Sequence, residues 1–175
     1  PWRALAALGA GALLLGAALA PADAAAEKSL VRLGYAGFLG DAQVIEATVG
    51  LEMPPGTRKS GSYRMALDVA MSGPLAQAVP FSMTAESLGS AGAAGVRPER
   101  FHSLTRIYQK AQTASLTYGE NGAVEIAADP PTVQAREARE QGLAQGTLDP
   151  LSAVVALVDE VVRTGECRGR VRVFD

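Results

Sequence analysis

Apolar residues recur at every second position through most of this chain, and this alternation restricts its fold more than any other feature. A period of two is typical of half-buried strands, because successive side chains of a strand point to opposite faces. The alternation is clearest in YRMALDVAMSG, where every second residue from Tyr63 to Met71 is apolar and Arg64 and Asp68 lie between them. Short alternating strands joined by turns predict an antiparallel sheet that curls on itself.

Further strands are predicted on both sides of this segment. They are SLVRLGYAGFLG and DAQVIEATVGLEM before it, and FSMTAESLGSA and RFHSLTRIY after it. ASLTYGENGAVEIAA predicts a hairpin that turns at residues 120–122, because Asn-Gly tolerates the positive φ angles of tight turns. Clusters of Gly, Pro and Ser predict loops over residues 54–62 and 89–99. The charged run AREARE, residues 135–140, is interpreted as a solvated helical turn.

The stretch GTLDPLSAVVALVDEVVRTGEC carries the strongest helix signals and predicts one helix over residues 149–164. Asp149 is a favourable N-cap residue, and proline is common at the first helical position, where Pro150 lies. Gly165 is a typical residue at the C-terminal end of a helix. Valine is a mediocre helix former, so burial has to stabilise this helix, and we expect it to pack against the sheet. The apolar stripe that would be buried consists of Leu151, Val154, Val155, Val158, Val161 and Val162.

The composition is that of one globular domain, and it argues against nucleic acid as a partner. Of the 175 residues, 48% are hydrophobic and 19% are charged, and the formal net charge is -2. Proteins that bind nucleic acid usually carry a basic face, since neutralisation of phosphates dominates their affinity. Aromatic residues make up only 5%, which provides little for stacking on bases.

Residues 1–26 have the order of a secretory signal peptide. Arg3 precedes an apolar run from Ala4 to Ala20, and the small-residue sites ADA and AAA follow. The run is rich in Ala and Gly and short for a stable span, so a permanent membrane anchor is the weaker alternative. The sequence therefore predicts an exported protein of the periplasm or cell envelope. Residues 27–175 form its single β-rich domain, which we expect to be truncated at the C-terminus.

Few residues suggest site chemistry: one cysteine, Cys167, and one histidine, His102. In an exported protein Cys167 favours a structural role, as a buried thiol or half of a disulfide, over a nucleophile or metal ligand. His102 has no nucleophile motif beside it, so a packed or surface histidine is favoured over a general base. One His and one Cys do not fill a zinc site, and no phosphate-loop fingerprint is present. We expect no metal, no cofactor and no catalytic residue.

Several of these stretches resemble an exported bacterial family, the domain of unknown function 3108. They are GTLDPLSAVVAL with CRGRVRVFD, and, in the same order as in the family, YAGFLGDAQVIEATV, YRMALDVAMSG and GVRPERF, over roughly residues 30–175. The resemblance implies a strongly curved antiparallel sheet or open barrel with a helix against it. It also implies further C-terminal strands, often with a cysteine that would pair with Cys167. It supplies no catalytic residues. In layout the chain is more loosely similar to periplasmic lipoprotein-carrier proteins.

These features favour a non-enzymatic envelope protein that binds a lipid, an acyl chain or a lipoprotein on the concave face of its sheet. Side chains there either line a cavity or fill a core, and methionines suit both. One alternative is a scaffolding protein that binds other proteins through sheet edges and has no small ligand. The other is a hydrolase that uses His102. The side chains expected on the concave face are Met65, Leu67, Val69, Met71, Phe81 and Met83.

Overall fold

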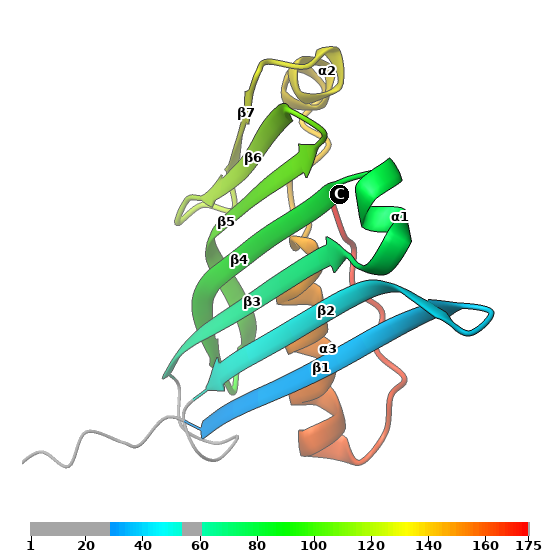
Figure 1. The fold of residues 1–175 in the computed structure, drawn as a ribbon. Helices are drawn as coiled ribbons and strands as arrows, with labels where there is room; N and C mark the ends of the chain where they lie inside the picture. The colour runs from blue at the N-terminus through cyan, green and yellow to red at the C-terminus, as the bar shows by residue number, and fades with distance from the viewer. Residues whose placement is uncertain (1–28, 54–60, 175) are drawn as a thin grey trace, which may run out of the picture.

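The computed structural model describes residues 29–53 and 61–174, which form an antiparallel sheet of seven strands in sequence order (Figure 1). The strands are β1 (Ser29–Leu39), β2 (Ala42–Met53), β3 (Gly61–Met71), β4 (Phe81–Gly92), β5 (Gly95–Ile107), β6 (Lys110–Tyr118) and β7 (Val124–Asp129). The sheet is not closed, and β1 and β7 are its edges. The predicted mainly β, antiparallel fold is therefore confirmed. The predicted signal peptide and most of the predicted loop at 54–62 lie outside the described residues.

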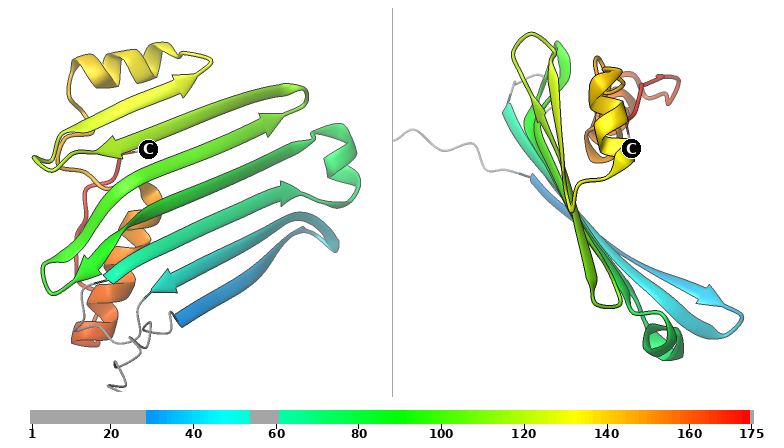
Figure 2. Two further views of the ribbon diagram at one scale, coloured as in Figure 1. Left: turned by 90° about the vertical axis from the view of Figure 1, so that its left-hand side faces the viewer. Right: turned by 90° about the horizontal axis from the view of Figure 1, so that it is seen from above.

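The alternation of side chains places a row of mostly apolar residues on a single face of the sheet. Val49 lies opposite Leu67 and Leu67 opposite Ala85, and the row continues to Ser103 on β5. We call this face the inner face. Seen from above, the sheet is strongly twisted and the two longer helices lie on one side of it (Figure 2). The period-two pattern thus determines which residues the helices can bury.

The predicted loop at 89–99 is wrong, because only a tight turn separates β4 from β5. Gly89 serves close packing instead of flexibility. A Cβ atom on Gly89 would lie 2.7 Å from the ring of Tyr63 and 2.4 Å from the carbonyl oxygen of Arg97. The register also slips at Gly89, and such a bulge accommodates Pro98 within β5.

Two short helices lie beside different strands of the sheet. Helix α1 (Gly73–Ala78) connects β3 to β4, and α2 (Val133–Glu140) follows β7 and packs on it (Figure 1). The hydroxyl oxygen of Thr132 caps α2 by accepting a hydrogen bond from the backbone N–H of Ala135 at 3.1 Å. Residues 135–140 therefore form part of a helix, and its buried Ala138 shows that one side of α2 is packed.

The predicted long helix is confirmed as α3 (Pro150–Thr164). The Asp149 carboxylate accepts hydrogen bonds from the backbone N–H groups of Leu151 and Ser152, at 3.1 and 2.9 Å. Gly165 ends the helix with a φ of 74°. Helix α3 lies against β3, β4 and β5. Within residues 29–53 and 61–174, no helix combines the length and apolar character needed to cross a membrane.

The apolar stripe of α3 is only partly buried, contrary to the prediction. Val155 is 0% exposed and Leu151 is 6% exposed, but Val154 and Val158 remain 42% and 37% exposed. The fully buried Ser152 explains the difference, since its hydroxyl has to reach hydroxyl groups on the sheet. The helix is rotated accordingly, and one side of the stripe borders solvent.

The C-terminal segment CRGRVRVFD forms less strand than predicted. The backbone N–H of Leu148 donates to the Arg172 carbonyl at 2.8 Å, and that of Phe174 donates to the Leu148 carbonyl at 2.9 Å. These bonds make one isolated parallel bridge. The segment returns past the start of α3 and brings Phe174 to the inner side of the sheet.

Two clusters of buried side chains form the core. One lies between α3 and the middle of the sheet, and the other joins β6 and β7 to α2 and the following turns. Phe101 packs against both clusters, so the core is continuous. The first cluster contains Tyr63, Met65, Ala85, Ala91, Leu151 and Val155, and the second contains Leu116, Val124, Ile126, Ala138 and Ala144.

The burial of α3 predicts different effects for the same substitution at two positions. Val155→Ala removes two buried methyl groups and leaves a cavity, so we expect a loss of about 2 kcal/mol in the free energy of unfolding. Val162 is 61% exposed, and Val162→Ala should change the free energy by less than about 0.5 kcal/mol. Urea unfolding followed by circular dichroism measures both. Equal losses would contradict the packing of α3.

Candidate functional site

An apolar cavity of about 660 Å³ lies between the inner face of the sheet, α2 and the start of α3. Its floor consists of side chains from β3 to β7. Its roof consists of residues of α2, the first residues of α3 and Phe174. The volume is in the usual range of small-molecule sites, about 300–1,000 Å³. The apolar residues around it include Leu67, Met83, Phe101, Leu116, Ile126, Leu151 and Phe174.

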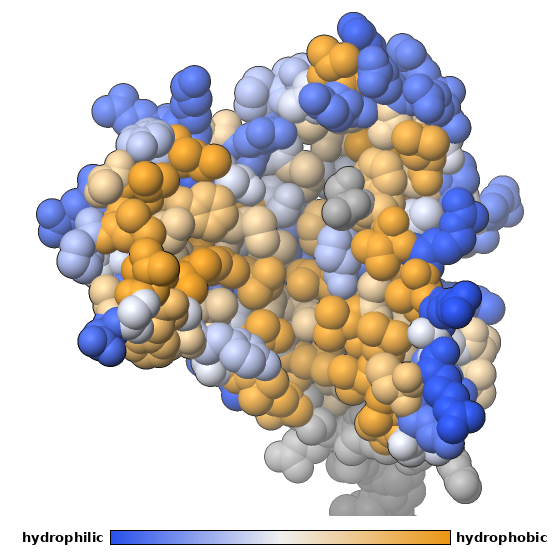
Figure 3. Space-filling model, turned by 90° about the vertical axis from the view of Figure 1, so that its right-hand side faces the viewer, coloured by the Kyte–Doolittle hydropathy of each residue, from blue (hydrophilic) through white to orange (hydrophobic). Residues whose placement is uncertain are grey.

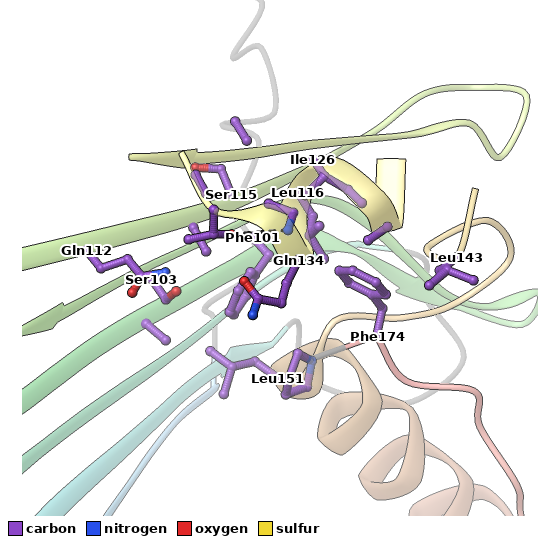
Figure 4. A pocket seen from close by; sticks show the side chains of 18 of the residues that line it. Phe101, Ser103, Gln112, Ser115, Leu116, Ile126, Gln134, Leu143, Leu151 and Phe174 are labelled. Atoms are coloured by element: carbon purple, nitrogen blue, oxygen red, sulfur yellow. Dashed lines mark hydrogen bonds between the residues drawn. The ribbon is translucent and has the colours of Figure 1, made fainter. Parts of the chain in front are cut away.

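Polar side chains gather toward one part of this cavity. Figure 4 shows Ser103 and Gln112 side by side, away from Phe174, with Gln134 of α2 pointing into the space between. Ser103 and Gln112 are near neighbours in the register of β5 and β6, since Ser103 lies opposite Ala114. Ser103, Gln112 and Gln134 thus form one polar region in a lining that is mostly apolar.

The apolar surface continues outside the cavity. Figure 3 looks onto this side of the molecule and shows orange side chains across a hollowed surface with blue side chains at its rim. On β1, Leu33 and Tyr35 are 47% and 57% exposed, and on α3 Val161 is 40% exposed. Large exposed apolar areas of this kind are typical of binding surfaces.

A second depression, of about 820 Å³, is a weaker candidate. It lies among the turns at the other end of the strands and is lined by residues such as Glu120, Gly122 and Gly146. Ligand sites are usually apolar and surrounded by protein, with a few polar groups that orient the ligand. The first cavity fits that description, and the second does not.

The wall between α3 and the sheet contains a buried polar cluster around Asp149. Asp149, Ser87 and Ser152 are each 0% exposed, and Tyr63 is 1% exposed. The hydroxyl groups of Ser87 and Ser152 both donate to Oδ2 of Asp149. Because the proton of Ser152 points to Asp149, the Tyr63 hydroxyl donates to Ser152, with 2.6 Å between the oxygens. The cluster ties β3 and β4 to the start of α3.

Burial near Asp149 affects two tyrosines. Desolvation raises the pKa of Tyr63 above its ordinary value, and the negative charge of Asp149 adds to the increase. The pKa of Tyr118 is also raised, mainly by burial and then by Asp149. The Tyr118 hydroxyl is buried near Asp149 but forms no well-aligned hydrogen bond with a described residue. Both phenols stay neutral at physiological pH, so the cluster is a packing element and offers no ionised nucleophile.

His102 lies on the outer face, away from the cavity, and is exposed. Its Nδ1 is 3.1 Å from the Ser115 hydroxyl oxygen. In register it lies opposite Glu86, whose carboxylate accepts a hydrogen bond from Nε of Arg64 at 2.7 Å. A serine, a histidine and an acid therefore lie in a row, but on an open sheet face without the walls that orient a substrate. The structure does not strengthen the hydrolase alternative.

Cys167 follows α3 and is exposed, so the buried-thiol interpretation is wrong. Its role as half of a disulfide stays a prediction. The described part of the chain contains no group of three or more His, Cys, Asp or Glu side chains that could hold a metal ion.

The concave-face residues expected from the sequence fall into four environments. Met65 is buried in the core, and Leu67 and Met83 line the cavity. Val69 lies between Ala47 and Met83 in a shallow depression of the sheet. Met71 and Phe81 lie beside α1. The choice between core and cavity thus has different answers at different positions. The α2 side of the site, including Gln134, was not predicted, because the charged run at residues 135–140 indicated only a solvated turn.

No family model, curated protein or solved structure matches this chain. The resemblance to the domain of unknown function 3108 therefore stays a prediction. The function has to be inferred from the geometry of the cavity.

The cluster predicts that Asp149→Ala destabilises the fold strongly. The variant loses the α3 cap, worth about 0.5–2 kcal/mol, and leaves buried hydroxyl groups unpaired at about 1–3 kcal/mol each. We expect a loss of about 3 kcal/mol or more in the free energy of unfolding, measured by urea titration.

Two variants serve as controls for Asp149→Ala. Asp149→Asn keeps an oxygen that accepts from the two backbone amides, so it should lose clearly less stability. Asp68→Ala removes an exposed carboxylate and should change stability by less than about 0.5 kcal/mol. If Asp149→Ala were as stable as Asp68→Ala, the buried cluster would not hold α3 in place.

Proposed function

We propose that this chain binds the acyl chain of a lipid or lipoprotein in the cavity below α2 and the start of α3, without catalysing a reaction. The proposed place of action is the periplasm or cell envelope, as the signal-peptide pattern of residues 1–26 predicts. The cavity itself carries the proposal, because it is apolar, of about 660 Å³, and bounded by two helices and a sheet.

The lining supports an extended apolar ligand over a compact polar one. Aromatic and aliphatic side chains from five strands contribute to a single surface, with Phe101 and Leu116 near its middle. Each buried methylene of an acyl chain contributes about 0.8 kcal/mol. A chain of several methylenes in this cavity therefore provides enough free energy for binding, even after the cost of ordering a flexible ligand.

The deeper wall of the cavity is part of the packed core. Leu116 and Leu151 line the cavity and are only 4% and 6% exposed. Leu67, Met83 and Phe174 also line it and are less buried. A ligand would therefore lie against side chains that the fold already holds in place.

Filling the cavity should abolish binding. Ala114 is on the floor of the cavity, and Ala114→Trp places an indole where the acyl chain would lie. With monoacylglycerols of increasing chain length as ligands, the unsubstituted chain should gain about fourfold in affinity per methylene until the cavity is full. Ala114→Trp should weaken binding at least about tenfold. Native mass spectrometry and isothermal titration calorimetry measure both effects.

Ala111→Trp is the matched control. Ala111 is on the same strand, is exposed, and has the opposite side-chain direction because it is an odd number of residues from Ala114. The Ala111→Trp variant should bind monoacylglycerols with the same affinity as the unsubstituted chain. The proposal fails if no monoacylglycerol binds, or if both tryptophan variants bind equally well.

A second candidate function, self-assembly through the sheet edge, is favoured by the exposure of β1. This edge strand has eleven residues, and Leu30 and Phe38 are 60% and 62% exposed. Natural edge strands are usually short or protected by charges, whereas β1 has Arg32 as its one charged residue. A second copy of the chain could pair with β1 in antiparallel register about Gly34, which would place Leu33 opposite Tyr35 of that copy.

A cysteine at the centre of β1 tests this pairing. No atom lies within 4 Å of a Cβ built on Gly34, so Gly34→Cys fits, and antiparallel partners are within disulfide reach. In a Cys167→Ser background, we expect Gly34→Cys to form a disulfide-linked dimer on mild oxidation and Leu39→Cys not to. A monomeric Gly34→Cys protein by non-reducing electrophoresis would exclude this mode of assembly.

A further inference from the structure

The polar region of the cavity carries information about the ligand's headgroup. Ser103, Gln112 and Gln134 come from β5, β6 and α2, so three separate elements bring polar groups to one region. A glutamine amide both donates and accepts hydrogen bonds, and a serine hydroxyl does the same. Such a set matches an uncharged polar group. An ester accepts hydrogen bonds, and an amide or hydroxyl group both donates and accepts them.

The charge around the cavity has one sign. Glu137 of α2 is the charged residue among those that line it. Glu137 is exposed and lies one helical turn from Gln134 on α2. A carboxylate or phosphate headgroup beside Gln134 would therefore meet a negative charge and no cation among the lining residues. A neutral headgroup avoids this repulsion and can still form hydrogen bonds with the glutamine and serine side chains.

We infer that this cavity selects acyl ligands with an uncharged, hydrogen-bonding headgroup, such as acyl glycerols and other acyl esters, over free fatty acids. The inference rests on the proposed acyl-binding function and adds the chemistry of the headgroup. The headgroup lies at Ser103, Gln112 and Gln134, and the acyl chain runs past Phe101 toward Leu151.

The test compares a monoacylglycerol with the fatty acid of the same chain length at neutral pH, where the carboxyl group is ionised. The two ligands share the tail, so any difference in affinity reports the headgroup. Measured by isothermal titration calorimetry on the whole chain, the monoacylglycerol should bind at least about tenfold more tightly.

Gln134→Arg adds a cation at the polar region of the cavity. We expect it to improve fatty-acid binding by about tenfold or more and to reduce or reverse the preference for monoacylglycerol. Gln77→Arg makes the same change on the exposed surface of α1, outside the cavity. It should leave the preference as it is in the unsubstituted chain.

The outcomes separate this inference from the function on which it rests. Tighter binding of the monoacylglycerol, with the preference altered by Gln134→Arg and unaltered by Gln77→Arg, supports both. Equal or tighter binding of the fatty acid to the unsubstituted chain overturns the headgroup inference and leaves acyl binding in place. A failure of both ligands to bind overturns the proposed function and this inference with it.

Discussion

The hydrogen bonds of one buried carboxylate determine how the layers of this protein fit together. Asp149 accepts from two backbone amides at the start of α3 and from hydroxyl groups on α3 and β4. A buried charge is costly unless it is fully hydrogen-bonded, and the dipole of the helix start favours a negative charge here. Tyr63 extends the network to β3 through Ser152. The position and rotation of α3 on the sheet follow from these contacts.

The rotation of α3 has a direct effect on the candidate site. Because Ser152 faces the sheet, the valine stripe of the helix is turned partly toward solvent, and Val154 is left 42% exposed. The helices then cover only part of an apolar face that spans seven described strands. The part between α2, the start of α3 and β3 to β7 remains as the cavity. The hydrogen bonding of Ser152 to the sheet thus leaves apolar surface available for a ligand.

The proposed function and the headgroup inference depend on different properties of that cavity. Acyl binding depends on the size of the cavity and on the apolar side chains along it. Burial of an acyl chain against such side chains is favourable without specific contacts. Headgroup choice depends on three neutral polar side chains and on Glu137, whose effects are directional or electrostatic. Substitutions at Ala114 and at Gln134 therefore probe separate parts of one site.

Local sequence patterns determined the strands, the antiparallel meander, and the helix that begins after Asp149 and ends at Gly165, because alternation, capping and turn chemistry act over a few residues. They gave the wrong result at residues 89–99, where Gly89 packs against a ring 26 positions earlier in the chain, at Tyr63. They also did not predict the rotation of α3, the role of α2 in the site, or the partners of Asp149. Those features depend on contacts between residues far apart in sequence, and only the tertiary structure brings these residues together.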